Sequence, residues 1–520
     1  MRHPVLSRCA AALLVSMSLG LSGLPAQAAA PASTASVAWV TVTGDADMDR
    51  QFAQAKAEKK PVLLYWGAKW CPPCNQLKAT LFNRADFIEQ SKAFVAVGLD
   101  GDAPGAQKLG ERFKVSGYPT LILFSPAGQE ITRLPGEADA PQVIKLLQLG
   151  LAGGRPIQAV LADAQGGKKL TANEWRLLAF YSWETDHQQL IAAKDKAAVL
   201  ARLAKAAEGG DAETALRLTL KALATEGSAL KPDAALLARV RAVLASPAQS
   251  HAMMDVLVNE APDLVRNLAP EAGPARQALV ADFEPALKRL EMDRSLSRAD
   301  RLGALMARVE LARIDAPKTE LNPKLPAALQ QESRDAAQRA HREITDGYER
   351  QAVVTSAAYL LTRAGLWKDS DELLKAALAR SHSPYYLMSQ LGGNARKQGQ
   401  KAEALRWYEE AFNKSEGPAT RLQWGAGYFT ALVELAPEDA TRIEKAASQL
   451  FTEAAGDPSA FYERSERSLA RVATQLQTWN KDGSKAAVIS RLKTQLDGVC
   501  GKLDAAETKA RAACGKLLKT

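Results

Sequence analysis

Short, nearly continuous apolar runs alternate with amphipathic segments from residue 37 to residue 152. Such runs are typical of strands covered on both faces of a sheet, and apolar residues at helical spacing are typical of the helices that cover them. Strands are predicted over residues 37–42, 61–66, 94–99, 118–124 and 129–134. Helices are predicted over residues 45–59, 71–82, 104–113 and 142–151. The pattern therefore predicts an α/β domain over residues 37–152.

The pattern changes at residues 153–156 (Gly-Gly-Arg-Pro), the clearest predicted domain boundary in the chain. Beyond it, Ala- and Leu-rich helical segments recur between Gly, Pro, Asp and Ser, and no strand is predicted. Residues 157–520 are therefore predicted to form an all-α region. Within it, a period of 34 residues relates Gly365 to Gly399, Ala377 to Ala411 and Pro384 to Pro418.

The second copy of this period carries a recognisable set of spacings. They resemble those of the tetratricopeptide family, with small residues where paired helices touch and Tyr408 filling the gap between them. The residues that carry the resemblance are Leu391, Gly392, Gly399, Ala404, Tyr408 and Ala411. The resemblance covers residues 351–418 and implies a helical-repeat array. Nearby aromatic residues, Trp424 among them, are predicted to be core residues of helix pairs, or alternatively to line a groove that binds a partner.

The amino terminus has the features of a secretory signal. Positive residues precede an apolar run at 10–24, and Ala26-Gln27-Ala28 supplies a cleavage site. The run is short for a membrane span, and no later segment reaches eighteen uninterrupted apolar residues. Residues 1–28 are therefore predicted to be a signal peptide of bacterial style, which places the mature chain in the periplasm without a transmembrane segment.

The distribution of charge along the chain argues against one class of function. The formal net charge of +9 is spread along the chain, and no run of five basic residues occurs, which argues against nucleic-acid binding. Removal of the signal peptide leaves four cysteines, Cys71, Cys74, Cys500 and Cys514. An even number of cysteines suits an oxidising compartment.

Cys71 and Cys74 are separated by two residues, which is the spacing of a zinc half-site or of a redox pair. A zinc site would need two further ligands, and Cys500 and Cys514 are distant and widely spaced. We therefore predict no metal and a redox-active dithiol. The predicted helix start gives Cys71 unpaired backbone N–H groups and a favourable dipole, which lower the pKa of its thiol. Cys74, one turn further, can then attack a mixed disulfide at Cys71.

The sequence Trp70-Cys71-Pro72-Pro73-Cys74, together with Gly117-Tyr118-Pro119-Thr120, resembles the two signatures of the thioredoxin superfamily. The resemblance implies thiol–disulfide exchange with no cofactor beyond the two catalytic cysteines. It also implies a cis peptide bond between Tyr118 and Pro119, and a substrate-docking surface formed by Trp70, Pro72, Tyr118 and Pro119. The implied partners are a protein or peptide disulfide and a redox partner protein, for which a membrane electron transporter is one candidate.

One position departs from the superfamily pattern. Thioredoxins carry a buried Asp six residues before the first cysteine, where this chain has Tyr65, and no Lys occurs at Val95–Val97. Tyr65 with Cys-Pro-Pro-Cys resembles the tryparedoxin and nucleoredoxin branch, whereas the signal peptide resembles exported bacterial thioredoxin-like reductases. Tyr65 and Lys69 are therefore candidate modulators of the dithiol, and the resemblance favours a reductase.

Cys500 and Cys514 would lie about 21 Å apart on one straight helix, too far for a disulfide. If the helix breaks at Gly501 and the chain folds back, a structural disulfide becomes possible, and an oxidising compartment favours it. A second redox pair is the alternative. For the whole chain, the sequence predicts a periplasmic protein-disulfide reductase whose helical repeats hold a partner. The alternative is an envelope scaffold or assembly factor in which the helical repeats do the work.

Overall fold

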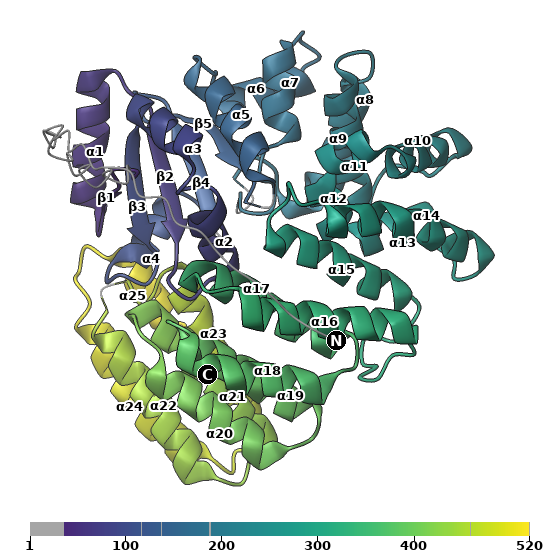
Figure 1. Ribbon diagram of the computed structural model, residues 1–520. Helices are drawn as coiled ribbons and strands as arrows, with labels where there is room; N and C mark the ends of the chain where they lie inside the picture. The colour runs from purple at the N-terminus through teal and green to yellow at the C-terminus, as the bar shows by residue number, and fades with distance from the viewer. Residues whose placement is uncertain (1–35, 116, 137, 187–188, 458, 519–520) are drawn as a thin grey trace, which may run out of the picture. The chain divides into compact units, whose positions relative to one another are not determined.

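A five-stranded mixed sheet forms the amino-terminal part of the protein in a computed structural model (Figure 1). The structure describes residues 36–518 apart from 116, 137, 187, 188 and 458, so the predicted signal peptide lies outside the described residues. The strands are β1 (Val40–Thr41), β2 (Val62–Gly67), β3 (Val95–Asp100), β4 (Thr120–Phe124) and β5 (Glu130–Leu134). Their order is β1-β3-β2-β4-β5, with β3 parallel to β1 and β2, and with β4 antiparallel to both β2 and β5.

Helices cover both faces of this sheet, as the continuous apolar runs predict. The alternation in β2 shows it, because Leu64 and Trp66 join one cluster of buried residues and Leu63 and Tyr65 join another. The helices of this part are α1 (Asp45–Glu58), α2 (Pro72–Thr80), α3 (Ala85–Gln90), α4 (Ala106–Arg112) and α5 (Ala140–Leu151), with the 3-10 helix η1 (Ser91–Ala93) before β3. The predicted α/β fold is confirmed. Strand β1 is shorter than predicted because only Val40 and Thr41 pair with β3.

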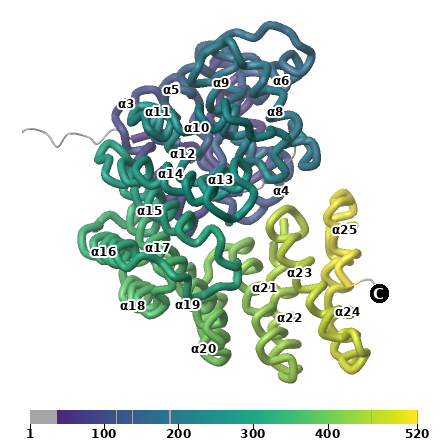
Figure 2. Tube along the Cα trace, turned by 90° about the vertical axis from the view of Figure 1, so that its right-hand side faces the viewer, coloured from purple at the N-terminus to yellow at the C-terminus, as the bar shows by residue number. Residues whose placement is uncertain are grey.

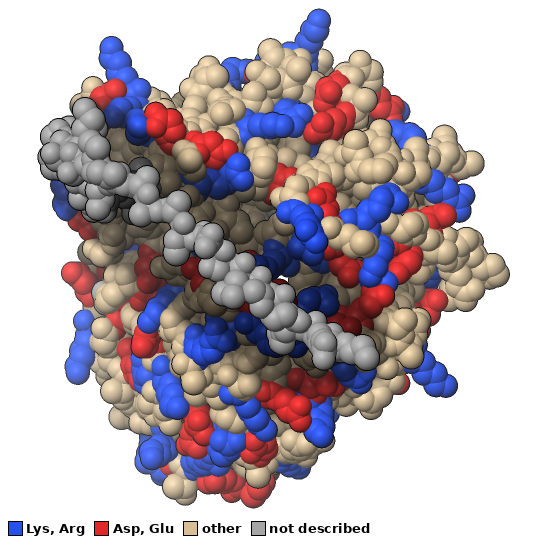
Figure 3. Space-filling model, viewed as in Figure 1, with Lys and Arg blue, Asp and Glu red and all other residues tan. Residues whose placement is uncertain are grey.

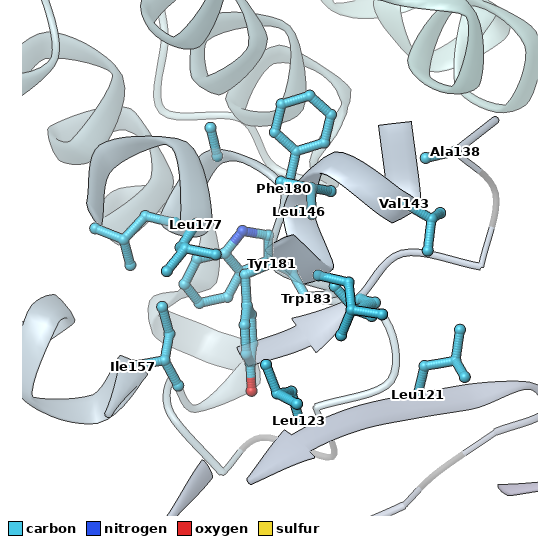
Figure 4. Close-up of a cluster of buried hydrophobic side chains, with 14 of the residues drawn as sticks. Leu121, Leu123, Ala138, Val143, Leu146, Ile157, Leu177, Phe180, Tyr181 and Trp183 are labelled. Carbon is cyan, nitrogen blue, oxygen red and sulfur yellow. The ribbon is translucent and has the colours of Figure 1, made fainter. Parts of the chain in front are cut away.

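The apolar cluster on the α2 side of the sheet continues beyond Pro156. Figure 4 shows Leu123 of β4 beside Tyr181 and Trp183, which come from the segment after α7. This segment also extends the hydrogen bonding of β5, because the N–H of Ser182 donates to the carbonyl oxygen of Arg133 at 3.1 Å. The buried Arg133 guanidinium in turn donates to the carbonyl oxygen of Thr185 at 2.6 Å. The boundary at 153–156 stays a prediction, since residues 36–520 cluster as one unit.

Among the described residues beyond Pro156, the structure has helices and no strand, as predicted. The first group is α6 (Ile157–Gln165), α7 (Ala172–Ala179), η2 (Ala193–Asp195), α8 (Lys196–Ala206), α9 (Ala212–Ala224), α10 (Ala234–Ala245), α11 (Pro247–Ala252), α12 (Met254–Asn259), α13 (Ala261–Leu268), α14 (Pro274–Met292), α15 (Arg298–Ala312) and α16 (Ala327–Glu343). The second group is α17 (Gly347–Arg363), α18 (Trp367–Ala377), η3 (Leu378–Arg380), α19 (Pro384–Lys397), α20 (Lys401–Lys414), α21 (Pro418–Leu435), α22 (Ala440–Ala455), α23 (Glu463–Trp479), α24 (Ala486–Gly501) and α25 (Thr508–Cys514). Figure 2 shows the helices from α20 to α25 side by side.

The period of 34 residues has a structural counterpart in α17 to α21. Gly365 and Gly399 both follow a helix with positive φ angles, 76° and 75°, which glycine adopts without steric cost. Pro384 and Pro418 each begin a helix, where a proline needs no N–H partner. A Cβ atom at Gly392 would come within 3.0 Å of the Tyr408 ring, so α19 and α20 pack closely only because residue 392 is a glycine. Helix pairs therefore repeat here.

Two further properties of the structure concern its surface charge and the length of its apolar helices. Lys and Arg side chains are interspersed with Asp and Glu over the face shown in Figure 3, as the even spread of charge in the sequence suggests. Within the described part of the chain, no helix is both long and apolar enough to cross a membrane.

Candidate redox-active site

Cys71 and Cys74 lie where the chain leaves β2 and enters α2. They are joined in a disulfide, with their Cα atoms 5.2 Å apart. Both side chains are buried, Cys71 being 2% and Cys74 0% exposed. The two cysteines that the sequence predicts to be catalytic therefore form one site at the carboxyl end of a central strand.

The start of α2 explains why Cys71 is the candidate nucleophile. Cys71 is the N-cap residue, and its Sγ accepts the backbone N–H of Cys74 at 3.2 Å. Pro72 begins the helix and is half-buried, and Pro73 beside it is exposed. An N–H donor and the positive end of the helix dipole both stabilise a negative charge on Sγ once the disulfide is reduced.

Asn75 is a site residue that the sequence analysis missed. Its side chain is fully buried, and Nδ2 donates to the carbonyl oxygens of Lys69 and Cys71, at 2.8 Å each. These bonds hold the turn before Cys71 against the first turn of α2. A polar residue four positions after Cys71, on the helix face that points back to the turn, was the available signal.

Tyr118 and Pro119 lie at the same end of the sheet as the disulfide. The Tyr118–Pro119 peptide bond is cis, and β4 begins at the next residue, Thr120, which pairs with Trp66 of β2. The Tyr118 ring stacks on Trp66 and meets Trp70 edge-on, with centroid distances of 6.0 Å in both cases. The structure therefore brings Trp70, Tyr118 and Pro119 of the expected docking surface together, and the fourth expected residue, Pro72, begins α2 next to Cys71.

The polar surroundings of the dithiol differ from those of a thioredoxin. Tyr65 occupies the place of the usual Asp, and its Oη is buried without a hydrogen-bond partner among the described residues. Burial, more than the nearby carboxylate of Asp100, raises the pKa of Tyr65 far above its usual range, so its phenol stays protonated. Lys69 is exposed and pairs with Glu416 at 2.8 Å. Burial also lowers the pKa of Lys78, in the last turn of α2.

Helices far along the chain contact Trp70, and no pattern in the sequence predicts these contacts. The indole Nε1 donates to Thr420 Oγ1 of α21 at 2.8 Å and to Asp102 Oδ2 at 2.9 Å. Gln351 Nε2 of α17 donates to the Trp70 carbonyl oxygen at 2.9 Å. The Trp70 ring also stacks on Tyr386 and meets Trp424 edge-on, with centroid distances of 5.7 and 4.9 Å.

Arg464 of α23 completes this contact. Its buried guanidinium pairs with Asp102 and lies over the rings of Trp70 and Tyr118, 5.4 and 5.0 Å from their centroids. We call the five side chains Gln351, Tyr386, Thr420, Trp424 and Arg464 the helical cover. It lies against Trp70 and Tyr118, two residues of the expected docking surface.

The structure also joins Cys500 and Cys514 in a disulfide, with Cα atoms 5.7 Å apart. Helix α24 ends at Gly501, and the chain folds back into α25, which ends at Cys514. This is the geometry that a break at Gly501 permits. Over the residues that the structure describes, no group of three or more His, Cys, Asp or Glu side chains is arranged to hold a metal ion.

Comparisons with known proteins agree on one part of the chain. A sequence family described as a thioredoxin-like domain matches residues 48–150. The thiol:disulfide interchange protein DsbD 2 of Pseudomonas aeruginosa is 37% identical over 116 residues, 22% of this chain and 20% of that protein. The thiol:disulfide interchange protein DsbD of Cronobacter sakazakii is 34% identical over 113 residues, 21% of this chain and 19% of that protein.

Residues 48–150 therefore form a thioredoxin-like domain that carries the Cys71–Cys74 pair and is homologous to a part of the DsbD proteins. The chain spans about a fifth of the length of these curated relatives. A solved structure titled DsbH Oxidoreductase aligns with 25% of this chain and 96% of its own length, at 21% identity and a TM-score of 0.20. That score is too low to support a conclusion.

Proposed function

We propose that this protein is a thiol–disulfide oxidoreductase that uses Cys71 and Cys74, and that it acts as a protein-disulfide reductase. The observation that carries the proposal is the position of Cys71, which caps α2 and accepts the N–H of Cys74 within a thioredoxin-like domain. Homology to part of proteins named for thiol:disulfide interchange supports the same reaction class.

The reaction starts from the reduced pair. The Cys71 thiolate attacks one sulfur of the substrate disulfide, a mixed disulfide forms, and the other substrate sulfur leaves as a thiolate. The Cys74 thiolate then attacks Cys71 Sγ, which closes the Cys71–Cys74 bond and releases the second substrate thiolate. Two electrons pass to the substrate, and the two cysteines supply all the redox chemistry. A redox partner with a reduced dithiol must then return two electrons, and a membrane electron transporter could supply them.

We place this activity in the periplasm, because residues 1–28 have the features of a cleaved signal peptide. The helical region, with its tetratricopeptide-like spacings, is proposed to hold a partner or substrate. The reduction potential tests the direction of electron flow, by equilibrating the full chain with glutathione buffers. A value near about −270 mV, as in thioredoxin, would support a reductase, and one near about −120 mV, as in DsbA, an oxidase.

A trapping experiment tests the reaction itself. In a Cys74→Ser variant, Cys71 lacks its resolving partner, so a mixed disulfide with a small disulfide such as oxidised glutathione should accumulate. Intact-mass measurement detects the adduct. The matched control is Cys514→Ser, which frees Cys500 near the carboxyl end of α24, where a thiolate is disfavoured. Equal adduct formation in both variants, or none in Cys74→Ser, would contradict the proposed function.

The scaffold alternative gains support from the helical cover, because a domain whose docking face is occupied within its own chain could serve mainly to bind. A rescue experiment separates the two functions. A Cys71→Ser, Cys74→Ser double variant should fail to restore the phenotype of a deletion strain if the protein is an oxidoreductase. Full restoration would favour the scaffold.

A further inference from the structure

We propose that the helical cover determines which disulfides react with the dithiol. In the closed form, in which the helical cover lies against Trp70, the dithiol exchanges with small disulfides. A protein disulfide reacts only in the open form, in which the cover has left Trp70. This inference rests on the proposed thiol–disulfide exchange. It concerns which disulfides reach Cys71, and it assigns that choice to residues more than 250 positions further along the chain.

Access to the sulfur is the first observation. Cys71 is 2% exposed, so its sulfur offers no surface on which a protein segment can dock in the closed chain, whereas a small disulfide needs only a local movement around the sulfur. Helix α17 packs directly against α2, which begins next to Cys71 (Figure 1). Further along α2, Gln76 Nε2 donates to Asp300 Oδ1 of α15 at 2.7 Å. The helical region therefore contacts the cysteine-bearing helix along its length as well as at the Trp70 turn.

The chemistry of the cover is the second observation. A protein segment that docks beside a dithiol needs backbone or polar partners and an apolar surface. The Trp70 carbonyl oxygen already accepts from Gln351, and the Trp70 indole already donates to Thr420. Tyr386 stacks on the Trp70 ring, and Trp424 meets it edge-on. The carbonyl oxygen, the indole N–H and the ring of Trp70, which an incoming segment would use, thus already have partners within the chain.

Arg464 is the residue on which the cover depends most. It is buried, pairs with Asp102 of the thioredoxin-like domain, and spans Trp70 and Tyr118. Its backbone N–H also donates to Gln107 Oε1 at 3.0 Å, and Gln107 in turn donates to the Tyr118 hydroxyl at 3.1 Å. Removing the guanidinium leaves Asp102 without its charged partner, which favours separation of the two surfaces and entry of water.

The test compares two substrates on the full-length chain. Reduced protein is mixed with oxidised glutathione, a small disulfide, or with insulin, a protein disulfide, and dithiothreitol regenerates the dithiol. Arg464→Ala should raise the rate of insulin reduction about tenfold, since it raises the population of the open form. The rate with oxidised glutathione should change less than about twofold, because the small disulfide does not need the open form.

The matched control is Arg421→Ala. Arg421 is an arginine of α21 that pairs with Glu453 of α22 and with carbonyl oxygens of the helical region, and it makes no contact with Trp70 among those that the structure gives it. Its loss should leave both rates unchanged. An equal rise of the insulin rate in Arg421→Ala would show that general loosening of the helices is responsible, and would overturn the proposal.

A measurement on the unmodified protein covers the case in which Arg464→Ala does not fold. Cys71 of the gently reduced chain is alkylated with iodoacetamide or with a polyethylene glycol maleimide, and peptide mass mapping locates the product. Relative to a free cysteine peptide, the large reagent should be slowed at least about tenfold more than the small one. Equal slowing would overturn the proposal.

The two substrates distinguish a failure of the specificity proposal from a failure of the proposed exchange reaction. If glutathione disulfide reacts but wild-type insulin reduction is as fast as that of Arg464→Ala, the cover does not set specificity. If Cys71 reacts with neither disulfide in either protein, thiol–disulfide exchange itself is wrong.

Discussion

The two disulfides of this protein are built from the same bond in opposite electrostatic settings. Cys71 caps the amino end of α2, whereas Cys500 lies in the last turn of α24 and Cys514 is the last residue of α25. The amino end of a helix stabilises a thiolate, and the carboxyl end destabilises it. The first pair therefore suits a bond that opens and closes, and the second a bond that stays closed.

Loop length separates the two bonds as well. The first joins residues 3 positions apart and the second joins residues 14 positions apart. A longer closed loop removes more conformational entropy from the unfolded chain. Cysteine count alone therefore does not assign a role. The two disulfides are distinguished by where each sulfur lies on its helix and by the number of residues that the bond encloses.

The largest expected effect is the loss of activity in Cys71→Ser. Without the thiolate at the start of α2, the exchange with oxidised glutathione should fall at least about a hundredfold. A Cys500→Ser, Cys514→Ser double variant should keep activity within about twofold, because neither sulfur takes part in the exchange. A comparable loss of exchange rate in the two variants would show that the two disulfides do not differ in function.

The second expected effect is on stability, for which the Cys500–Cys514 bond should matter more than the Cys71–Cys74 bond. The Cys500→Ser, Cys514→Ser variant should lose about 3 kcal/mol of unfolding free energy, as the loop length predicts. Denaturant titration followed by circular dichroism measures it. The Cys71–Cys74 bond closes a much shorter loop, so the Cys71→Ser, Cys74→Ser variant should lose about 1 kcal/mol less unfolding free energy than the Cys500→Ser, Cys514→Ser variant. If the short pair proves more stabilising, the structural role assigned to the second pair is incorrect.

A third, smaller effect is the pH dependence of stability that His382 contributes. Burial, together with the positive charges of Lys69 and Lys78, lowers the pKa of His382 from its usual 6.5. The unfolded chain then binds a proton that the folded chain rejects, so His382 reduces stability as the pH falls below 6.5, down to its folded pKa. His382→Gln should flatten this part of the pH–stability curve and match wild type near pH 8. An unchanged slope would show that His382 is not responsible.

The smallest effect is expected at Lys69. Its ion pair with Glu416 is largely exposed, with side chains 49% and 65% accessible, so Lys69→Ala should change the unfolding free energy by less than about 1 kcal/mol. The rate with oxidised glutathione should also change little, because salt and Glu416 screen the lysine charge. A large fall in that rate would mean that Lys69 tunes the Cys71 thiolate directly.

Most of the sheet could be predicted because its strands are local patterns. The apolar runs at 61–66 and 94–99 correspond to β2 and β3 within one residue. The helix predicted from the cysteines to residue 82 ends at Thr80, and the short α3 was missed, since six residues carry little periodicity. Cys71, Cys74 and Pro119 were found because their motifs are short and contiguous.

The helical cover could not be predicted, for the opposite reason. Trp70 and Thr420 are 350 positions apart, and nothing local in either segment encodes their contact. The sequence indicated that Trp424 belongs to a helix-pair core, which its burial agrees with, but not that Trp70 inserts beside it. Arg464 carried no signal at all, because an arginine in a helix is ordinarily a solvated side chain.

The hydrogen bond between Ser182 and β5 has a practical consequence for anyone who shortens this protein. A fragment that ends at residue 152 loses Ser182, the Thr185 carbonyl that binds Arg133, and the aromatic rings of Tyr181 and Trp183 over the sheet. It would display β5 as a bare edge strand, with unpaired backbone groups beside exposed apolar side chains. Such an edge recruits other strands, so the fragment is expected to self-associate, and kinetics measured on it would describe an aggregate.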